Sequence, residues 1–233
     1  MRIPLFVAFQ VFIVTSTVAQ TVVPITSEPS HHLIISNQYV RVFEVEVPPK
    51  AETLYHQHDY DYLYVAIGDA DVTGFRLNEK PAQVKLKDGD VELAKGPFAH
   101  KAVNNGDRPF RNVTVELLGG SGESICGHPG GDICGAFSYW GNGSRQGEVI
   151  HTTKVEVNDV WLKGKSGIGP FSYPYLLVAV SDLSLQQSSQ NRTTEIAIHA
   201  GKAFWNDQLG AKLDNSSGLA KFILIGFPAA KTQ

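Results

Sequence analysis

Apolar and polar residues alternate along most of the chain after its first twenty residues. Residues 39–47 (YVRVFEVEV) alternate almost without exception and end at two prolines, and residues 112–117 (NVTVEL) follow the same rule. This period of two is typical of antiparallel strands that bury one face. Turns such as 87–90 (KDGD) and 104–107 (NNGD) separate the runs, and no window keeps a helical period. The pattern predicts an all-β sandwich or barrel.

One part of this pattern occurs twice. Residues 60–72 (YDYLYVAIGDADV) return as residues 173–185 (YPYLLVAVSDLSL), and six of these positions are identical. Chance similarity between two generic strands is the alternative to a true repeat. The repeat predicts two copies of one β unit, with an N-terminal unit over 20–118, a Gly/Cys-rich linker over 119–147 and a C-terminal unit over 148–233.

Composition excludes several classes of protein. The 233 residues carry a formal net charge of −3, and no stretch concentrates Lys and Arg into a stripe that could neutralise phosphates, so we expect no nucleic-acid partner. The hydrophobic content of 42% suits an ordinary core and excludes disordered and collagen-like chains. No Gly-x-Ser-x-Gly element indicates a nucleophilic serine, and no glycine-rich loop ends as a phosphate-binding loop does.

The first residues have the composition of a signal peptide. Arg2 is followed by an apolar run over 3–14 and by the small residues Thr17-Val18-Ala19. We expect a signal peptide over 1–19, cleavage before Gln20, and a secreted or periplasmic protein without a membrane span after cleavage. A retained N-terminal anchor is the alternative, although the apolar run is short for a span of about 20 residues.

The two cysteines, Cys126 and Cys134, flank a short stretch rich in Gly and Pro. An exported protein can keep disulfides, so we expect these two residues to form one. The alternative is a metal site made of the two thiols and His128, but that spacing matches no common zinc pattern.

Three histidines and one acid have the spacing of a metal site. His56 and His58 are separated by one residue, so both imidazoles point to one face of a strand. Asp61 joins them only if the chain turns near residue 60, and His100 comes from a later strand. Such a turn would put Asp61 in one interior row with Leu63, Val65 and Ile67. Three imidazoles and a carboxylate suit one divalent transition metal (Fe, Mn, Ni, Cu or Zn) rather than Ca or Mg.

The same residues resemble the motifs of the cupin superfamily. His56-Gln57-His58 matches the His-x-His pair of its first motif, and Asp61 occupies the acid position counted back from Gly68. Gly89 and the segment 98–104 (FAHKAVN) match the leading Gly and the end of the second motif. The resemblance implies that the metal ligands are His56, His58, Asp61 and His100. Asp replaces the usual Glu and lies one residue closer to His58, so a three-histidine site is the alternative.

The resemblance also has implications for the second half of the chain and for the activity. The repeat places Gly169, Phe171, Pro174 and Gly210 at the four ligand positions, and none can bind a metal through its side chain. We therefore expect a bicupin of two antiparallel β-barrels of the jelly-roll type, in which the C-terminal one is degenerate. The implied activity is that of a metal-dependent dioxygenase-type oxidoreductase on a small oxygenated molecule, with an isomerase or lyase next. A non-catalytic cupin that binds a metal, a sugar or another small ligand is the alternative.

The sequence gives weaker indications about oligomeric state, partners and the remaining histidines and tyrosines. We expect the protein to be a monomer or a homodimer whose partner is a small molecule. Four other histidines are interpreted as ordinary surface or core residues: His31, His32, His151 and His199. Four tyrosines lie near the first motif, and one of them could line a pocket: Tyr55, Tyr60, Tyr62 and Tyr64.

Overall fold

The structure is a computed structural model that describes residues 21–127, 134–135, 137–189 and 192–228. Within these ranges the chain forms β-strands and one short 3-10 helix, η1 (Ile25–Ser27), which confirms the all-β prediction. The expected signal peptide over 1–19 lies outside the described residues. None of the described segments is a helix long and apolar enough to cross a membrane.

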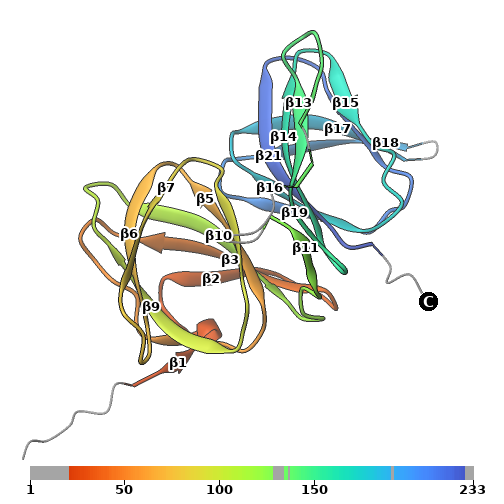
Figure 1. The fold of residues 1–233 in the computed structure, drawn as a ribbon. Coiled ribbons are helices and arrows are strands. Elements are labelled where there is room, and N and C mark those ends of the chain that lie inside the picture. Colours follow the sequence, from red (N-terminus) through yellow and green to blue (C-terminus); the bar gives the residue numbers. More distant parts are fainter. Residues whose placement is uncertain (1–20, 128–133, 136, 190–191, 229–233) are drawn as a thin grey trace, which may run out of the picture.

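The first half of the chain forms two five-stranded sheets (Figure 1). One sheet contains, in spatial order, β1 (Val23–Pro24), β4 (His56–His58), β9 (Phe98–Asn104), β6 (Ala70–Arg76) and β7 (Ala82–Leu86). The other contains β2 (His31–Ser36), β3 (Val40–Val47), β10 (Phe110–Leu117), β5 (Tyr62–Ile67) and β8 (Val91–Ala94). All pairs are antiparallel except β1 with β4. We call these two sheets the N-terminal unit.

The second half forms a seven-stranded and a four-stranded sheet, which we call the C-terminal unit. The larger sheet contains, in order, β11 (Ser124–Cys126), β13 (Arg145–Thr152), β14 (Glu156–Lys163), β21 (Leu219–Gly226), β16 (Tyr175–Ala179) and β19 (Ala203–Asn206), with β12 (Ser138–Tyr139) paired to β13. The smaller contains β15 (Ser166–Ile168), β20 (Lys212–Asn215), β17 (Leu183–Ser189) and β18 (Arg192–Ile198).

The segment expected to be a linker, 119–147, is partly strand. It supplies β11, β12 and the first residues of β13 to the large C-terminal sheet, because these short runs find hydrogen-bond partners along β13 and β14. The expected bridge between Cys126 and Cys134 is present as a disulfide.

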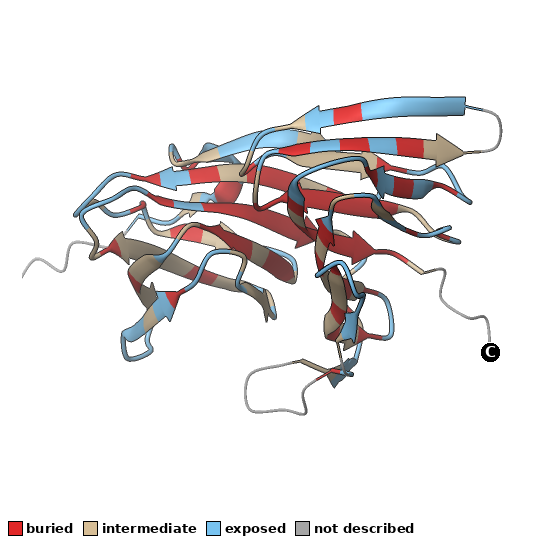
Figure 2. Ribbon diagram, turned by 90° about the horizontal axis from the view of Figure 1, so that it is seen from above, coloured by how far each residue is buried: buried red, intermediate tan, exposed pale blue. Residues whose placement is uncertain are grey.

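The described residues form three apolar cores between the sheets. Figure 2 shows that buried residues concentrate on the central strands. One core fills the N-terminal unit around Phe43 and Phe110, and one fills the C-terminal unit around Leu177 and Phe222. The largest core joins the two units, because β3, β5 and β10 pack their second face against β14, β16 and β21. We call it the inter-unit core.

Strand β10 therefore differs from a half-buried strand. Val113, Val115 and Leu117 enter the inter-unit core. The alternating polar residues are buried as well, because Thr114 lines the cavity of the N-terminal unit and Glu116 lies beside His58 in the same unit. Alternation in the sequence correctly predicted the strand, but a second sheet covers the face expected to meet solvent.

The internal repeat appears as equivalent strands. The order β3-β10-β5 in the N-terminal unit corresponds to β14-β21-β16 in the C-terminal unit. The Nδ2 of Asn104 donates to the carbonyls of Val47 (3.0 Å) and Arg108 (2.8 Å), and the Nδ2 of Asn215 donates to those of Leu162 (3.1 Å) and Gly164 (3.1 Å). Two side-chain amides at equivalent positions thus make the same kind of hydrogen bonds to backbone carbonyls in both units.

Candidate metal centre

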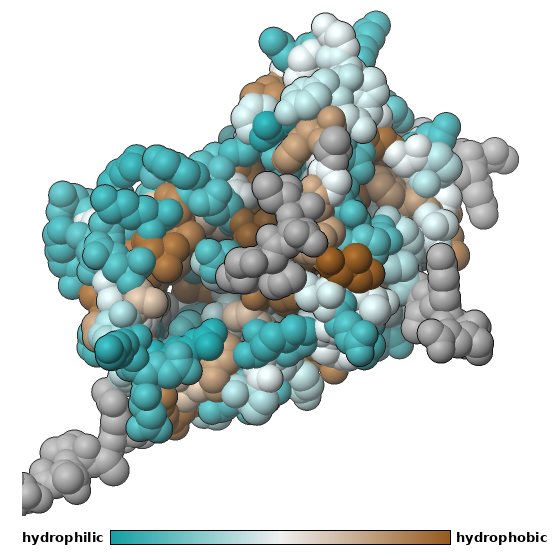
Figure 3. Space-filling model, viewed as in Figure 1, coloured by the Kyte–Doolittle hydropathy of each residue, from teal (hydrophilic) through white to brown (hydrophobic). Residues whose placement is uncertain are grey.

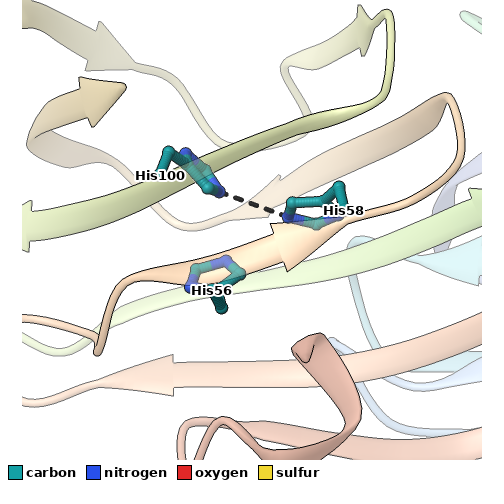
Figure 4. Close-up of side chains that lie close together, drawn as sticks. All are labelled: His56, His58 and His100. Carbon is teal, nitrogen blue, oxygen red and sulfur yellow. Dashed lines mark hydrogen bonds between the residues drawn. The ribbon is translucent and has the colours of Figure 1, made fainter. Parts of the chain in front are cut away.

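Three of the four predicted ligands meet inside the N-terminal unit. His56 and His58 lie on β4 with Gln57 between them, so both side chains leave the same face of the strand. His100 lies on the neighbouring strand β9, directly opposite His56 in the register. Figure 4 shows the three imidazoles turned toward one another from these two strands. Each offers one nitrogen, and these nitrogens all lie within 4.8 Å of one another.

The ring nitrogens of this triad are poorly satisfied by the protein. The Nε2 atoms of His58 and His100 lie 3.2 Å apart, and the buried Nε2 of His56 has no hydrogen-bond partner. The Nδ1 of His56 lies 2.9 Å from the carbonyl oxygen of Leu54, which can only accept, so this nitrogen carries the proton. The lone pair of His56 is therefore on Nε2, the atom left without a partner. A buried nitrogen of this kind fits a metal ligand.

The environment keeps the three imidazoles neutral. Burial lowers the pKa of His56 to about 3, and the nearby His31 and His58 act in the same direction. Burial also lowers the pKa of His58, although the nearby Glu116 acts in the opposite direction. Burial, together with His56 and His58, holds the pKa of His100 well below its usual range. A metal binds the neutral form of histidine, so the triad is in the correct protonation state at neutral pH.

A buried carboxylate stands behind the triad. Glu116 on β10 is fully buried, and its Oε1 lies 3.6 Å from the Nδ1 of His58. Its Oε2 lies 2.7 Å from the Nη2 of Arg41, which supplies the compensating charge. Sequence reasoning missed both residues because their polar positions on alternating strands looked solvent-facing.

The structure does not bring Asp61 to the histidines, which corrects the four-ligand expectation. Tyr62 turns inward and stacks on His58 with ring centroids 4.0 Å apart, so its neighbour Asp61 leaves the opposite side of the extended chain. The Asp61 carboxylate accepts hydrogen bonds from the backbone N–H of Gly96 (2.9 Å) and from the backbone and hydroxyl of Ser121 (2.9 and 2.6 Å). Burial would raise its pKa, but these donors and Lys95 lower it.

The residues that follow Asp61 share its orientation. Leu63, Val65 and Ile67 were expected to form an interior row with it, and they do share one face of β5. That face packs in the inter-unit core rather than around the triad. The hydrophobic row was recognised, but it covers the other side of the sheet.

One further histidine lies at the site. His31, interpreted from sequence as an ordinary residue, has its ring centroid 4.6 Å from that of His56. Its Nδ1 lies 2.5 Å from the Oε2 of the buried Glu28, whose pKa is lowered because His31 and two backbone N–H groups outweigh the effect of burial. No spacing in the sequence links these two residues to the motif at 56–58.

The triad lines a cavity of about 330 Å³ inside the N-terminal unit. Apolar side chains such as Val47, Leu86 and Phe110 form much of its wall, and Tyr62 and Tyr64 line it as well, as expected for one of the motif tyrosines. Figure 3 shows apolar surface framed by polar side chains on this unit. The volume is at the lower end of the range for small-molecule sites.

The corresponding interior of the C-terminal unit is filled. Phe171, at the place that the repeat assigns to His58, packs in the core of that unit with its ring centroid 4.8 Å from that of Tyr175. Ala211, next to the assigned Gly210, is fully buried in the same core. Apolar side chains thus occupy the space that the triad occupies in the first unit.

Comparison with known proteins gives structural likeness without sequence likeness. No family model and no curated protein matches the chain. Among solved structures, AerE from Microcystis aeruginosa has a TM-score of 0.60 at 15% identity, over 86% of this chain and 98% of that one. A cupin 2 conserved barrel domain protein from Leptotrichia buccalis has a TM-score of 0.55 at 8% identity, over 87% and 90%. Salicylate 1,2-dioxygenase from Pseudaminobacter salicylatoxidans has a TM-score of 0.56 at 10% identity, over 84% and 76%.

Proposed function

Because this chain has the cupin fold, we propose that it is a secreted, mononuclear metal-dependent enzyme of the dioxygenase type that acts on a small oxygenated molecule. The observation that carries this proposal is the group of three buried, neutral imidazoles, His56, His58 and His100, on the wall of a largely apolar cavity. The metal is a divalent first-row transition metal, because imidazole nitrogen suits these ions better than Ca or Mg.

The residues present fit such an ion. The unpartnered Nε2 of His56 and the facing Nε2 atoms of His58 and His100 provide three donors without rearrangement of the strands. Three protein ligands leave positions open for small molecules. When bound, a redox-active ion supplies electron transfer to O₂ or polarisation of a substrate oxygen.

The chain itself positions and shields the reaction. The Leu54 carbonyl holds the proton of His56 on Nδ1, and Glu116 faces Nδ1 of His58, so both rings direct Nε2 inward. Burial raises the pKa of Tyr62 and of Tyr64, with Glu92 adding to the effect at Tyr64. Both phenols therefore keep their protons. The phenol of Tyr64 is hydrogen-bonded to Glu92, whereas that of Tyr62 can donate a hydrogen bond to a substrate oxygen. The apolar walls exclude water from reactive species.

The comparisons support this class of activity without assigning a substrate. One similar structure is a salicylate 1,2-dioxygenase, and a variant of that enzyme is known in complex with gentisate. The disulfide between Cys126 and Cys134 suits an exported protein. The C-terminal unit, whose interior is packed, has a structural role in this proposal.

Elemental analysis tests the metal site. The mature protein should carry about one equivalent of transition metal, and a His56→Ala/His58→Ala variant should carry none. His199→Ala is the matched control, because His199 is an exposed imidazole in the other unit. Equal metal in the wild type and the double variant would refute the site.

Oxygen uptake over a panel of diols, phenols and keto acids tests the activity. Uptake by the metal-loaded wild type, and none by the double variant, is the expected result. Metal without any turnover, including isomerase or lyase turnover measured on the same panel, would instead favour a non-catalytic cupin that binds a small ligand.

A further inference from the structure

Arg76 lies at the edge of the triad's cavity. It is the last residue of β6 and is paired across the sheet with His100 on β9. Residues paired in this way have their side chains on one face, about 5 Å apart at Cβ. Arg76 therefore shares the interior face with His100 and lines the cavity, and its guanidinium lies 4.0 Å from the ring centroid of Phe98.

The charge of Arg76 is not neutralised by the protein. Among the described residues, no carboxylate forms an ion pair with Arg76, although Glu79 and Glu92 also line the cavity. Lys80 adds a second positive charge to the lining. Stacking on Phe98 orders the guanidinium, and such a stacked fork is suited to bidentate binding of a carboxylate.

The triad itself carries no negative charge. Its three ligands are neutral imidazoles, and Asp61, the carboxylate expected beside them, lies elsewhere. The nearby Glu116 is already paired with Arg41. No carboxylate would therefore be among the three ligands of a divalent ion at the triad. An ion held by three neutral ligands, with the exposed guanidinium of Arg76 at the edge of its cavity, favours an anionic ligand.

The apolar lining of the cavity determines what kind of group the ligand can carry besides its anionic group. Its inner wall consists largely of apolar side chains, among them Val45, Val72 and Val84. Such a wall favours an apolar or aromatic body, because a second charged group there would lose its hydration without a partner.

We infer that the N-terminal cavity takes small organic carboxylates with an apolar or aromatic body, and that Arg76 binds their carboxylate group. This inference rests on the proposed function, since it assigns the substrate class of the same site. Arg76 is then the residue that selects an acid over the corresponding amide or alcohol.

The test compares acids with their neutral amides. Isothermal titration calorimetry is run on metal-free and Zn(II)-loaded protein with benzoate and benzamide, 2-hydroxybenzoate and 2-hydroxybenzamide, and hexanoate and hexanamide. At least one acid should bind about tenfold more tightly than its amide, as a charge-assisted hydrogen-bond pair predicts. Arg76→Gln should remove most of this preference and Arg76→Lys should keep part of it.

A matched control and the Zn content separate the possible failures. Arg192→Gln removes the same charge from an exposed strand of the C-terminal unit and should leave the preference unchanged. Protein that takes up one Zn(II) but binds no acid more tightly than its amide, or keeps its preference in Arg76→Gln, overturns the inference and leaves the metal site intact. Failure to take up Zn(II) refutes the metal site instead, and the metal-free titrations then decide on Arg76.

Discussion

The Nδ1 of His58 lies 3.6 Å from Oε1 of Glu116, and both side chains are buried. A carboxylate cannot donate when ionised, so it favours the tautomer of His58 that keeps its proton on Nδ1 and its lone pair on Nε2. The contact thus connects strand β10, which is shared with the inter-unit core, to the triad. Mutation of Glu116 can measure how much this contact contributes to metal binding.

Glu116→Gln should weaken metal binding about 10- to 100-fold, the usual effect of losing a carboxylate behind a ligating histidine. Competition with a chelator for Zn(II) or Co(II) measures this change. Glu195→Gln, an exposed glutamate on β18, is the control and should bind metal as the wild type does. Unchanged affinity in a folded Glu116→Gln variant would show that Glu116 serves stability alone.

Metal binding should stabilise the folded protein. A ligand at one hundred times its dissociation constant adds about 2.7 kcal/mol to the free energy of unfolding. For a chain of this size, that increment raises Tm by several degrees. Differential scanning calorimetry with and without Zn(II) should show the rise in the wild type and in His199→Ala, but not in His100→Ala. A rise in His100→Ala would place the stabilising ion elsewhere.

Asp61→Asn should reduce stability at neutral pH by about 1 kcal/mol, because the ionised carboxylate accepts hydrogen bonds from Gly96 and Ser121. The pKa of Asp61 is lower in the folded protein than its ordinary value. Its contribution is therefore complete above the unfolded-state pKa and is lost as the pH falls through the folded-state pKa. Denaturant unfolding at several pH values should show the wild type and Asp61→Asn converging in acid.

The same Asp61→Asn protein also tests the correction to the ligand set. Its metal content should equal that of the wild type, since Asp61 lies outside the triad. Asp207→Asn, at an exposed loop position, should change neither stability nor metal content. Loss of metal in Asp61→Asn would restore the four-ligand site.

Phe171→Ala should cost about 3 kcal/mol of stability, the lower end for an emptied phenylalanine site in a packed core. The metal content should not change, because Phe171 lies in the C-terminal unit. Tyr139→Ala removes an exposed ring (70% accessible) and should alter stability by less than about 0.5 kcal/mol. A small loss in Phe171→Ala would show that the second interior is loosely filled.

Features that depend on residues close together in the chain could be predicted from the sequence. The His-x-His spacing places His56 and His58 on one face, and the motif around 98–104 supplies His100, so the triad was predicted. Asp61 was misplaced because its direction depends on whether Asp61 or Tyr62 turns inward, and alternation allows either. Glu116 was missed because only the packed structure shows that both faces of β10 are covered.

Asn104 and Asn215 perform the same task in the two units, although one unit encloses imidazoles and the other a solid apolar interior. The same strand framework therefore forms around either interior, and interior side chains can be exchanged without changing the loop contacts made by these two asparagines. Histidines introduced at Phe171 and Ala211, with smaller residues around them, would be a rational starting point for engineering a second centre.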